Sequence, residues 1–163
     1  DTDEDYLEKY FPDNYIAEPI EYKKNKTHIS KEFTLPRYHE ALMIRIGFIR
    51  PKIENSYEYL ACIVTPMKNN LRSADAFKNC PSYNPGIRIK WTLKNTQDNS
   101  IRSGEYNSLF DNPSASWGVA VEYLIGSPKK IHPGKYILIT EPMNDFDGIS
   151  LLRPHILITN PYF

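Results

Sequence analysis

Hydrophobic residues alternate with polar ones along much of this chain. The clearest run spans residues 87–94, where the apolar positions are Ile87, Ile89, Trp91 and Leu93. Successive side chains of a β-strand point to opposite faces of a sheet, so this run predicts a strand with one face in the core and one in water.

Other segments show the same period or form short apolar runs of strand length. The further expected strands are residues 29–35, 42–48, 57–64, 117–125, 134–140 and 155–159. Pro, Asn and Gly loops separate them, and no segment of about 12 residues shows the helical period of 3.6. About 7–9 antiparallel strands are typical of an all-β fold, which we expect to be an immunoglobulin-like β-sandwich.

The expected domain organisation divides the chain near residue 26. Residues 27–163 carry the strand patterns and are expected to form a single β-sandwich domain. Residues 1–26 begin with an acidic run and continue with Tyr6, Leu7, Tyr10 and Phe11 before Pro12. This segment is expected to be an N-terminal tail or tether with a short helical turn, which Pro12 stops.

Charge and hydropathy bear on the partners. The chain has 20 Lys plus Arg and 20 Asp plus Glu, for a formal net charge of zero, which argues against a nucleic acid as partner. No apolar run approaches the roughly 18 residues that span a bilayer. The chain starts at Asp1 without Met. We therefore expect that an upstream signal has been removed and that the protein is periplasmic or extracellular. A membrane tether through a removed N-terminal lipid anchor is compatible with this expectation.

The chain has two cysteines, Cys62 and Cys80. In an exported protein an even count permits one disulfide, which would stabilise the fold by about 3 kcal/mol through loop closure. Two free thiols are the alternative. Cys80 lies in a polar loop where a lone thiol gains little from burial, and this favours the disulfide. Neither cysteine has a second Cys or His at the spacing of a zinc site.

A search for catalytic chemistry finds no recognisable constellation. There is no Gly-x-Ser-x-Gly elbow, and the histidines stand singly, as expected at a surface or loop edge. Asp145-x-Asp147-Gly148 resembles the opening of a calcium loop, but Ser150, Leu151 and Leu152 stand where further ligands belong. A solvated turn is the better interpretation. We therefore predict that the protein is not an enzyme and has no metal or cofactor.

Two loops are longer than a sandwich needs, residues 66–85 and 141–154. Long loops within a compact domain are usually functional or disordered. Loop aromatics are enriched at protein interfaces, where rigid rings act as anchors. The predicted partner-binding residues are Phe77, Tyr83, Phe110, Asp145, Phe146 and Asp147. The sequence is equally compatible with an alternative, in which one of these aromatic rings folds back onto the sandwich.

Residues 132–138, His132-Pro133-Gly134-Lys135-Tyr136-Ile137-Leu138, resemble the Pro-Gly-x-Tyr entry to a late strand in immunoglobulin-like extracellular domains. There the Gly sets the turn and the Tyr packs at the sheet corner. Residues 33–38 and 42–46, with the block from Gly134 to Ile158, also resemble bacterial sandwich lipoproteins of the envelope. Some of these occur beside type VI secretion effectors as periplasmic immunity proteins. The resemblance covers Ile29–Thr159 and carries no catalytic residue.

The sequence thus leads to three hypotheses. The first is an envelope protein that binds and neutralises another protein, such as a secreted toxin or effector, by occluding its active site with a loop. The second is a carbohydrate-binding or adhesion module, which an exposed row of coplanar aromatic rings would favour. The third and least supported is an enzyme, which would need a buried, convergent set of histidines and carboxylates.

Overall fold

The computed structural model describes residues 14–49, 86–108, 120–146 and 149–160. Within these ranges the chain forms β-strands and one 3-10 turn but no α-helix, which confirms the all-β prediction. The elements are β1 (Asn14–Pro19), β2 (His28–Ile29), β3 (Phe33–Leu35), β4 (His39–Ala41), β5 (Met43–Ile49), β6 (Arg88–Asn95), β7 (Ile101–Asn107), β8 (Ala120–Gly126), β9 (Lys129–Ile131), β10 (Gly134–Pro142), η3 (Ile149–Leu152) and β11 (His155–Thr159).

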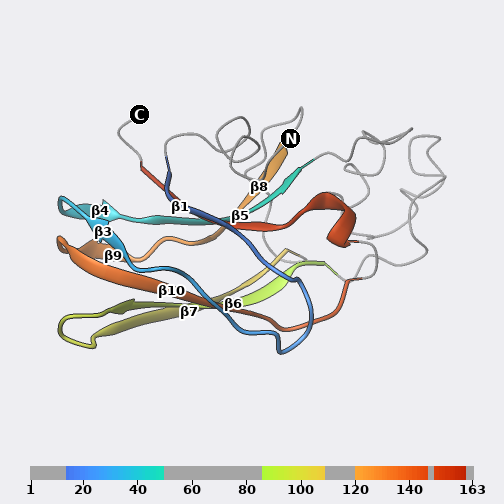
Figure 1. Ribbon diagram of the computed structural model, residues 1–163, viewed down its shortest axis with the longest axis horizontal. Helices are drawn as coiled ribbons and strands as arrows, with labels where there is room; N and C mark the ends of the chain where they lie inside the picture. Colours follow the sequence, from blue (N-terminus) through green and yellow to red (C-terminus); the bar gives the residue numbers. More distant parts are fainter. Residues whose placement is uncertain (1–13, 50–85, 109–119, 147–148, 161–163) are drawn as a thin grey trace.

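Two antiparallel sheets lie one over the other (Figure 1). Sheet A has the order β1-β11-β5-β8, and sheet B has the order β2-β10-β6-β7, with β3 also paired to β10. A short ladder joins β4 to β9. This is a sandwich-like arrangement of the kind that the alternating pattern predicts. Among the described residues there is no helix long and apolar enough to cross a membrane.

The strand order bears on the immunoglobulin-like prediction. In the immunoglobulin constant arrangement the last two strands share one sheet. Here β10 belongs to sheet B and pairs with β6, whereas β11 belongs to sheet A between β1 and β5. The described strands therefore establish an antiparallel sandwich without that final pair.

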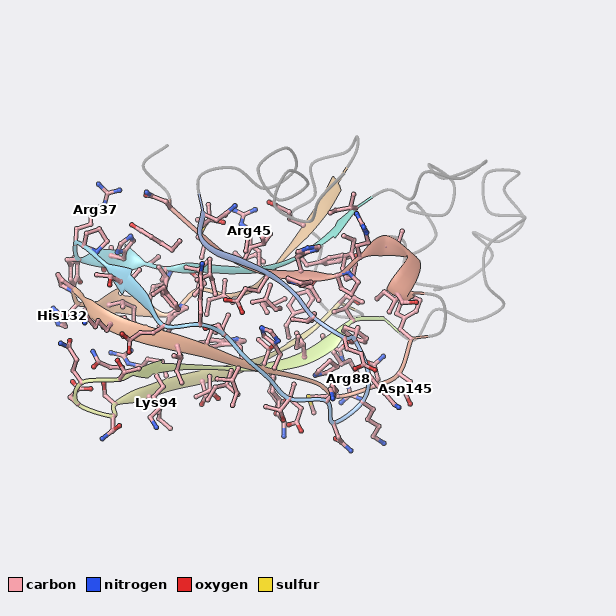
Figure 2. The ribbon with its side chains drawn as sticks, in the orientation of Figure 1. Arg37, Arg45, Arg88, Lys94, His132 and Asp145 are labelled. Carbon is pink, nitrogen blue, oxygen red and sulfur yellow. The ribbon has the colours of Figure 1, made fainter. Side chains whose placement is uncertain are left out.

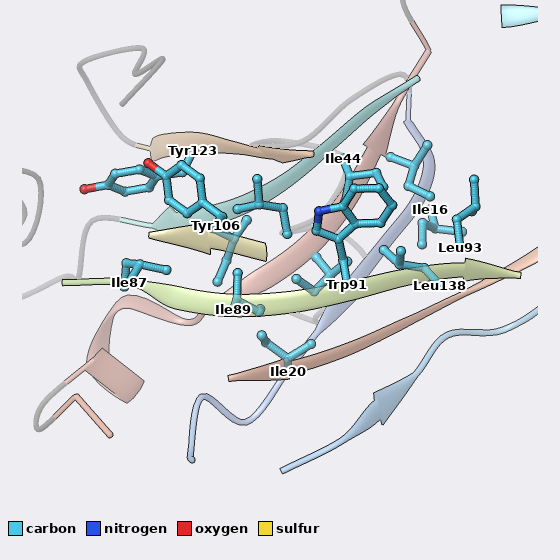
Figure 3. Packing of buried hydrophobic residues seen from close by; sticks show 14 of the residues in the cluster. Ile16, Ile20, Ile44, Ile87, Ile89, Trp91, Leu93, Tyr106, Tyr123 and Leu138 are labelled. Carbon is cyan, nitrogen blue, oxygen red and sulfur yellow. The ribbon is translucent and has the colours of Figure 1, made fainter. Parts of the chain in front are cut away.

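The core lies between the two sheets, where the predicted apolar positions point. Ile44, Ile46 and Phe48 of β5 are fully buried, and so are Ile89 and Leu138 on the facing sheet. The outward residues of β6, by contrast, are exposed or half-buried. Figure 3 shows the Trp91 indole in the layer of buried side chains that includes Ile44, Ile89 and Leu138, with Tyr106 and Tyr123 further along the same layer.

Four strands lie where the sequence pattern did not predict them: the short strands β4 and β9, which pair with each other, and the longer strands β1 and β7. β1 occupies Asn14–Pro19, within the segment expected to be a tail, and pairs with β11 from Asn14 to Pro19. Its Ile16 side chain is 2% exposed and belongs to the core. β7 lacks regular alternation because Gly104 occupies an inward position, opposite Trp91. The expected helical turn and the expected strand at 57–64 lie outside the described residues.

Candidate functional site

A groove of about 660 Å³ lies at one end of the sandwich, between the β1–β2 connection and the β10–β11 connection. We call it the loop-end groove. Its lining comprises Pro19, Ile20, Glu21, Tyr22, Lys23, Asp145, Phe146, Ile149, Ser150, Arg153, Pro154 and His155. The volume falls in the range of about 300–1,000 Å³ that is usual for ligand pockets.

Hydrogen bonds from backbone N–H groups of residues 20–25, a segment that includes most of the first wall of the groove, hold it against residues 142–154. The Ile20 N–H donates to the Pro154 carbonyl at 2.9 Å, and the Asn25 N–H donates to the Pro142 carbonyl at 2.9 Å. The Lys24 N–H donates to Asp145 Oδ1 at 3.0 Å. Asn25 has φ 64°, the left-handed conformation that asparagine tolerates in turns. The two connections are therefore a joined unit, although about 120 residues separate them.

The Tyr22 hydroxyl lies at the centre of the hydrogen bonds that connect the two walls, which we call the Tyr22 joint. It donates to Asn144 Oδ1 at 2.6 Å and accepts from the Arg88 N–H at 2.9 Å. The Asn144 amide in turn donates to the Gly86 carbonyl at 2.9 Å. Burial raises the pKa of Tyr22 above its usual value, so the hydroxyl keeps the proton that it donates. Figure 2 shows Arg88 and Asp145 together at this end of the molecule.

The second wall contains the η3 turn and the start of β11. The Ile149 N–H donates to the Phe146 carbonyl at 3.2 Å, and the Arg153 N–H donates to the Ser150 carbonyl at 3.1 Å. His155 Nδ1 lies 2.5 Å from the Arg153 carbonyl, which can only accept, so Nδ1 carries a proton. This contact fixes the turn at Arg153, whose φ is 47°.

The chemistry of the groove is an apolar floor with a rim of both charge signs. Ile20, Tyr22, Phe146 and Ile149 are buried, whereas Glu21, Lys23, Asp145, Ser150 and Arg153 are exposed. An apolar centre within a polar rim is the usual anatomy of a protein interface. Such a surface can bind a partner by shape and by charge complementarity.

The predicted partner-binding residues reach the groove in part. Asp145 is exposed on its rim, while Phe146 is 5% exposed and belongs to the core cluster. Phe146 has thus folded back onto the sandwich, one of the two outcomes compatible with the sequence. The other predicted residues, Phe77, Tyr83, Phe110 and Asp147, lie outside the described residues, as do Cys62 and Cys80 with their predicted disulfide. Sequence reasoning did not identify the contribution of residues 19–23, because only the fold brings them beside residues 145–155.

The histidines differ from their expected surface positions in two cases. His39 is 1% exposed and His155 is 6% exposed. His39 Nε2 lies 3.0 Å from the Tyr15 hydroxyl, and its Nδ1 lies 2.9 Å from the Arg37 carbonyl, so it is a hydrogen-bonded core residue. Within the described ranges no group of three or more His, Cys, Asp or Glu residues could hold a metal ion.

The residues behind the immunoglobulin resemblance form a local contact at the start of β10. The Tyr136 hydroxyl donates to the His132 carbonyl, four residues upstream, at 2.7 Å. The Tyr136 ring is buried and stacks on Phe33 with a centroid distance of 6.3 Å. The same type of contact, a tyrosine corner, closes the entry to a late strand in immunoglobulin-like sandwiches.

No family model matches the chain, and no curated protein matches it significantly. Among solved structures, the protein GEBA250068378 from Sulfurospirillum deleyianum is similar in fold, with a TM-score of 0.64 and 16% sequence identity. The match covers 91% of this chain and 98% of that chain. At this identity the likeness concerns the fold alone.

Proposed function

We propose that this protein is a binding protein of the cell envelope that captures another protein at the loop-end groove and neutralises it. An immunity protein against a type VI secretion effector is the specific case that the sequence resemblance suggests. The observation that carries the proposal is the groove itself. It has an apolar floor and a rim with positive and negative side chains, and hydrogen bonds between distant segments hold both in place.

The rigidity of the groove supports tight binding. A surface that is already ordered loses little conformational entropy on association, so more of the contact energy appears as affinity. The Tyr22 joint and the Lys24–Asp145 hydrogen bond supply this order on one wall. The η3 turn supplies it on the other. A partner would insert an apolar side chain over Ile20 and Ile149 and place charged groups against the rim.

The immunoglobulin-like assignment belongs to this proposal as well. Two features support it: the Tyr136 corner and the buried Trp91 between the sheets. The position of β11 in sheet A is the point at which the chain departs from that arrangement. The assignment therefore stays a prediction.

The first experiment uses the full chain as bait in a pull-down from envelope and secreted fractions of the source organism. We expect one dominant protein in stoichiometric amount. The affinity of that protein is then measured by calorimetry for the wild type and for Ser150→Arg, which places a bulky side chain at the groove rim. We expect at least about tenfold weaker binding, because interface energy concentrates in a few central contacts.

The matched control is Ser103→Arg, the same substitution on the exposed outer face of β7. If both variants bind the partner as tightly as the wild type does, the interface lies away from the groove.

Failure to capture any protein would overturn the neutralising function and favour the second hypothesis, glycan binding. For that alternative the relevant observation is Tyr38, which is 40% exposed and packs on the His132 ring with a centroid distance of 5.4 Å. A glycan array with the full chain tests it directly.

A further inference from the structure

A second hollow, of about 270 Å³, lies between the β6–β7 hairpin and the β9–β10 turn. We call it the hairpin-end hollow. Figure 2 shows His132, one of its residues, at the end of the molecule opposite Asp145. Its lining comprises Leu93, Asn95, Gln97, Asp98, Ser100, Arg102, Lys130, Ile131, His132, Pro133 and Tyr136. It shares no residue with the loop-end groove, so it is an independent site.

Arg102 reaches this hollow from an unusual position. It is in register with Leu93, a core residue that is 1% exposed, so both point to the inner side of sheet B. The Arg102 Nη1 group donates to the Lys129 carbonyl at 3.3 Å, which ties the guanidinium to β9. A guanidinium has five N–H donors in a planar fork that matches a carboxylate. The contact with Lys129 orients the fork and uses one of these donors.

Two further groups add donors around the same space. Lys130 is exposed and has φ 55°, a conformation that non-glycine residues seldom adopt and that recurs at ligand sites. Asn95 is 8% exposed, and its Oδ1 already accepts from the N–H groups of Gln97 and Asp98. The Nδ2 group is therefore the part of this amide that can donate a hydrogen bond to a ligand.

The charge of the hollow limits what it can hold. Arg102 and Lys130 contribute two positive charges and Asp98 contributes one negative charge, so the formal sum is +1 with His132 left aside. Asp98 keeps its charge, because hydrogen bonds from Ser100 lower the pKa of its carboxyl. A singly charged anion balances this sum, whereas a phosphate dianion exceeds it. The small volume, with Leu93 and Ile131 buried beneath, suits one compact group.

We propose that the hairpin-end hollow binds a single carboxylate group, oriented by the Arg102 fork and assisted by Lys130 and the Asn95 amide. The shared chemistry is the carboxylate, which an acidic sugar or a simple organic acid could supply. The other reason for a charge on the inner side of an edge strand is protection against edge-to-edge pairing, and this role needs no ligand.

The test is a titration of the full chain with glucuronate, acetate and inorganic phosphate, followed by calorimetry and by the NMR signal of the Asn95 side-chain amide. We expect saturable binding of the carboxylates with a shift of that signal. Tighter binding of glucuronate than of acetate identifies an acidic sugar, and equal binding identifies recognition of the carboxylate alone. Tighter binding of phosphate, or no saturable binding of any probe, overturns the proposal.

Two variants separate ligand binding from a structural role. Arg102→Gln removes the fork but also changes the contact with β9, whereas Lys130→Gln removes a charge and leaves that contact in place. Both are expected to weaken carboxylate binding at least about tenfold, as expected for charge-assisted hydrogen bonds. Lys94→Gln on the outer face of β6 is the matched control and should bind as the wild type does. If Lys130→Gln also binds as the wild type does, the proposed site is wrong. Ser150→Arg should leave this binding intact.

Discussion

At the residue scale, the packing of Trp91 shows how two glycines make room for one large side chain. A Cβ atom built on Gly126 of β8 would lie 2.4 Å from the indole, and one built on Gly104 of β7 would lie 2.6 Å from it. The two glycines belong to different sheets, so the indole fills the space that both leave. Side chains in protein cores are packed too densely for such contacts to relax freely.

Gly126→Ala is therefore expected to destabilise the fold by about 1–3 kcal/mol, the usual cost of overpacking a core. The free energy of unfolding is measured by urea denaturation. Ser127→Ala, next along the chain, is the control and should change it by less than about 0.5 kcal/mol. Trp91→Phe should reduce the cost of Gly126→Ala in a double-mutant cycle. Additive effects of the two substitutions would show that the glycine is not needed for the indole.

At the element scale, the connection between β1 and β2 is held by the buried Tyr22 hydroxyl rather than by a regular ladder. The Tyr22 pKa is raised in the folded state, whereas an exposed tyrosine in the unfolded chain titrates near pH 10. Above that pH the unfolded chain binds fewer protons than the folded one. The contribution of Tyr22 to the free energy of unfolding is therefore fully present below about pH 10. It is lost as the pH rises above that value.

Tyr22→Phe is expected to cost about 1–2 kcal/mol at neutral pH, because Asn144 Oδ1 loses the hydroxyl that donates to it and the Arg88 N–H keeps only its longer contact of 3.2 Å with Asn144 Oδ1. The same variant should show a shallower loss of stability above about pH 10 than the wild type does. Both effects are measured by denaturation at a series of pH values. Tyr38→Phe, at an exposed tyrosine, is the control for the neutral-pH effect. An unchanged alkaline slope in Tyr22→Phe would show that this hydroxyl does not contribute to it.

At the scale of the whole molecule, the first and last described strands lie side by side in sheet A. β1 pairs with β11, and β11 separates it from β5. Ile16 of β1 enters the common core with Ile156 and Ile158 of β11. Residues 14–19 therefore take part in the sandwich, although the sequence pattern placed the domain start at residue 27.

A fragment that starts at residue 27 tests this part of the fold. We expect it to lose the cooperative thermal transition of the full chain, because removal of β1 exposes the edge of β11 and the core beside Ile16. Circular dichroism during heating measures the transition. A full-length Ile16→Ala variant separates the buried side chain from the strand and should melt cooperatively, but at a lower temperature. A fragment that melts like the full chain would restore the boundary at residue 27.

The sequence by itself determined the β-strands whose burial follows a period of two, such as β6 and β10, because that period depends only on strand geometry and on which face meets water. It did not determine β1, which contributes one fully buried side chain, or β7, where Gly104 replaces a core side chain. The tertiary structure alone decided the sheet of β11, the burial of Phe146 and the pairing of residues 19–23 with 145–155. Each of these depends on contacts between segments far apart in the chain, and no local pattern records such contacts.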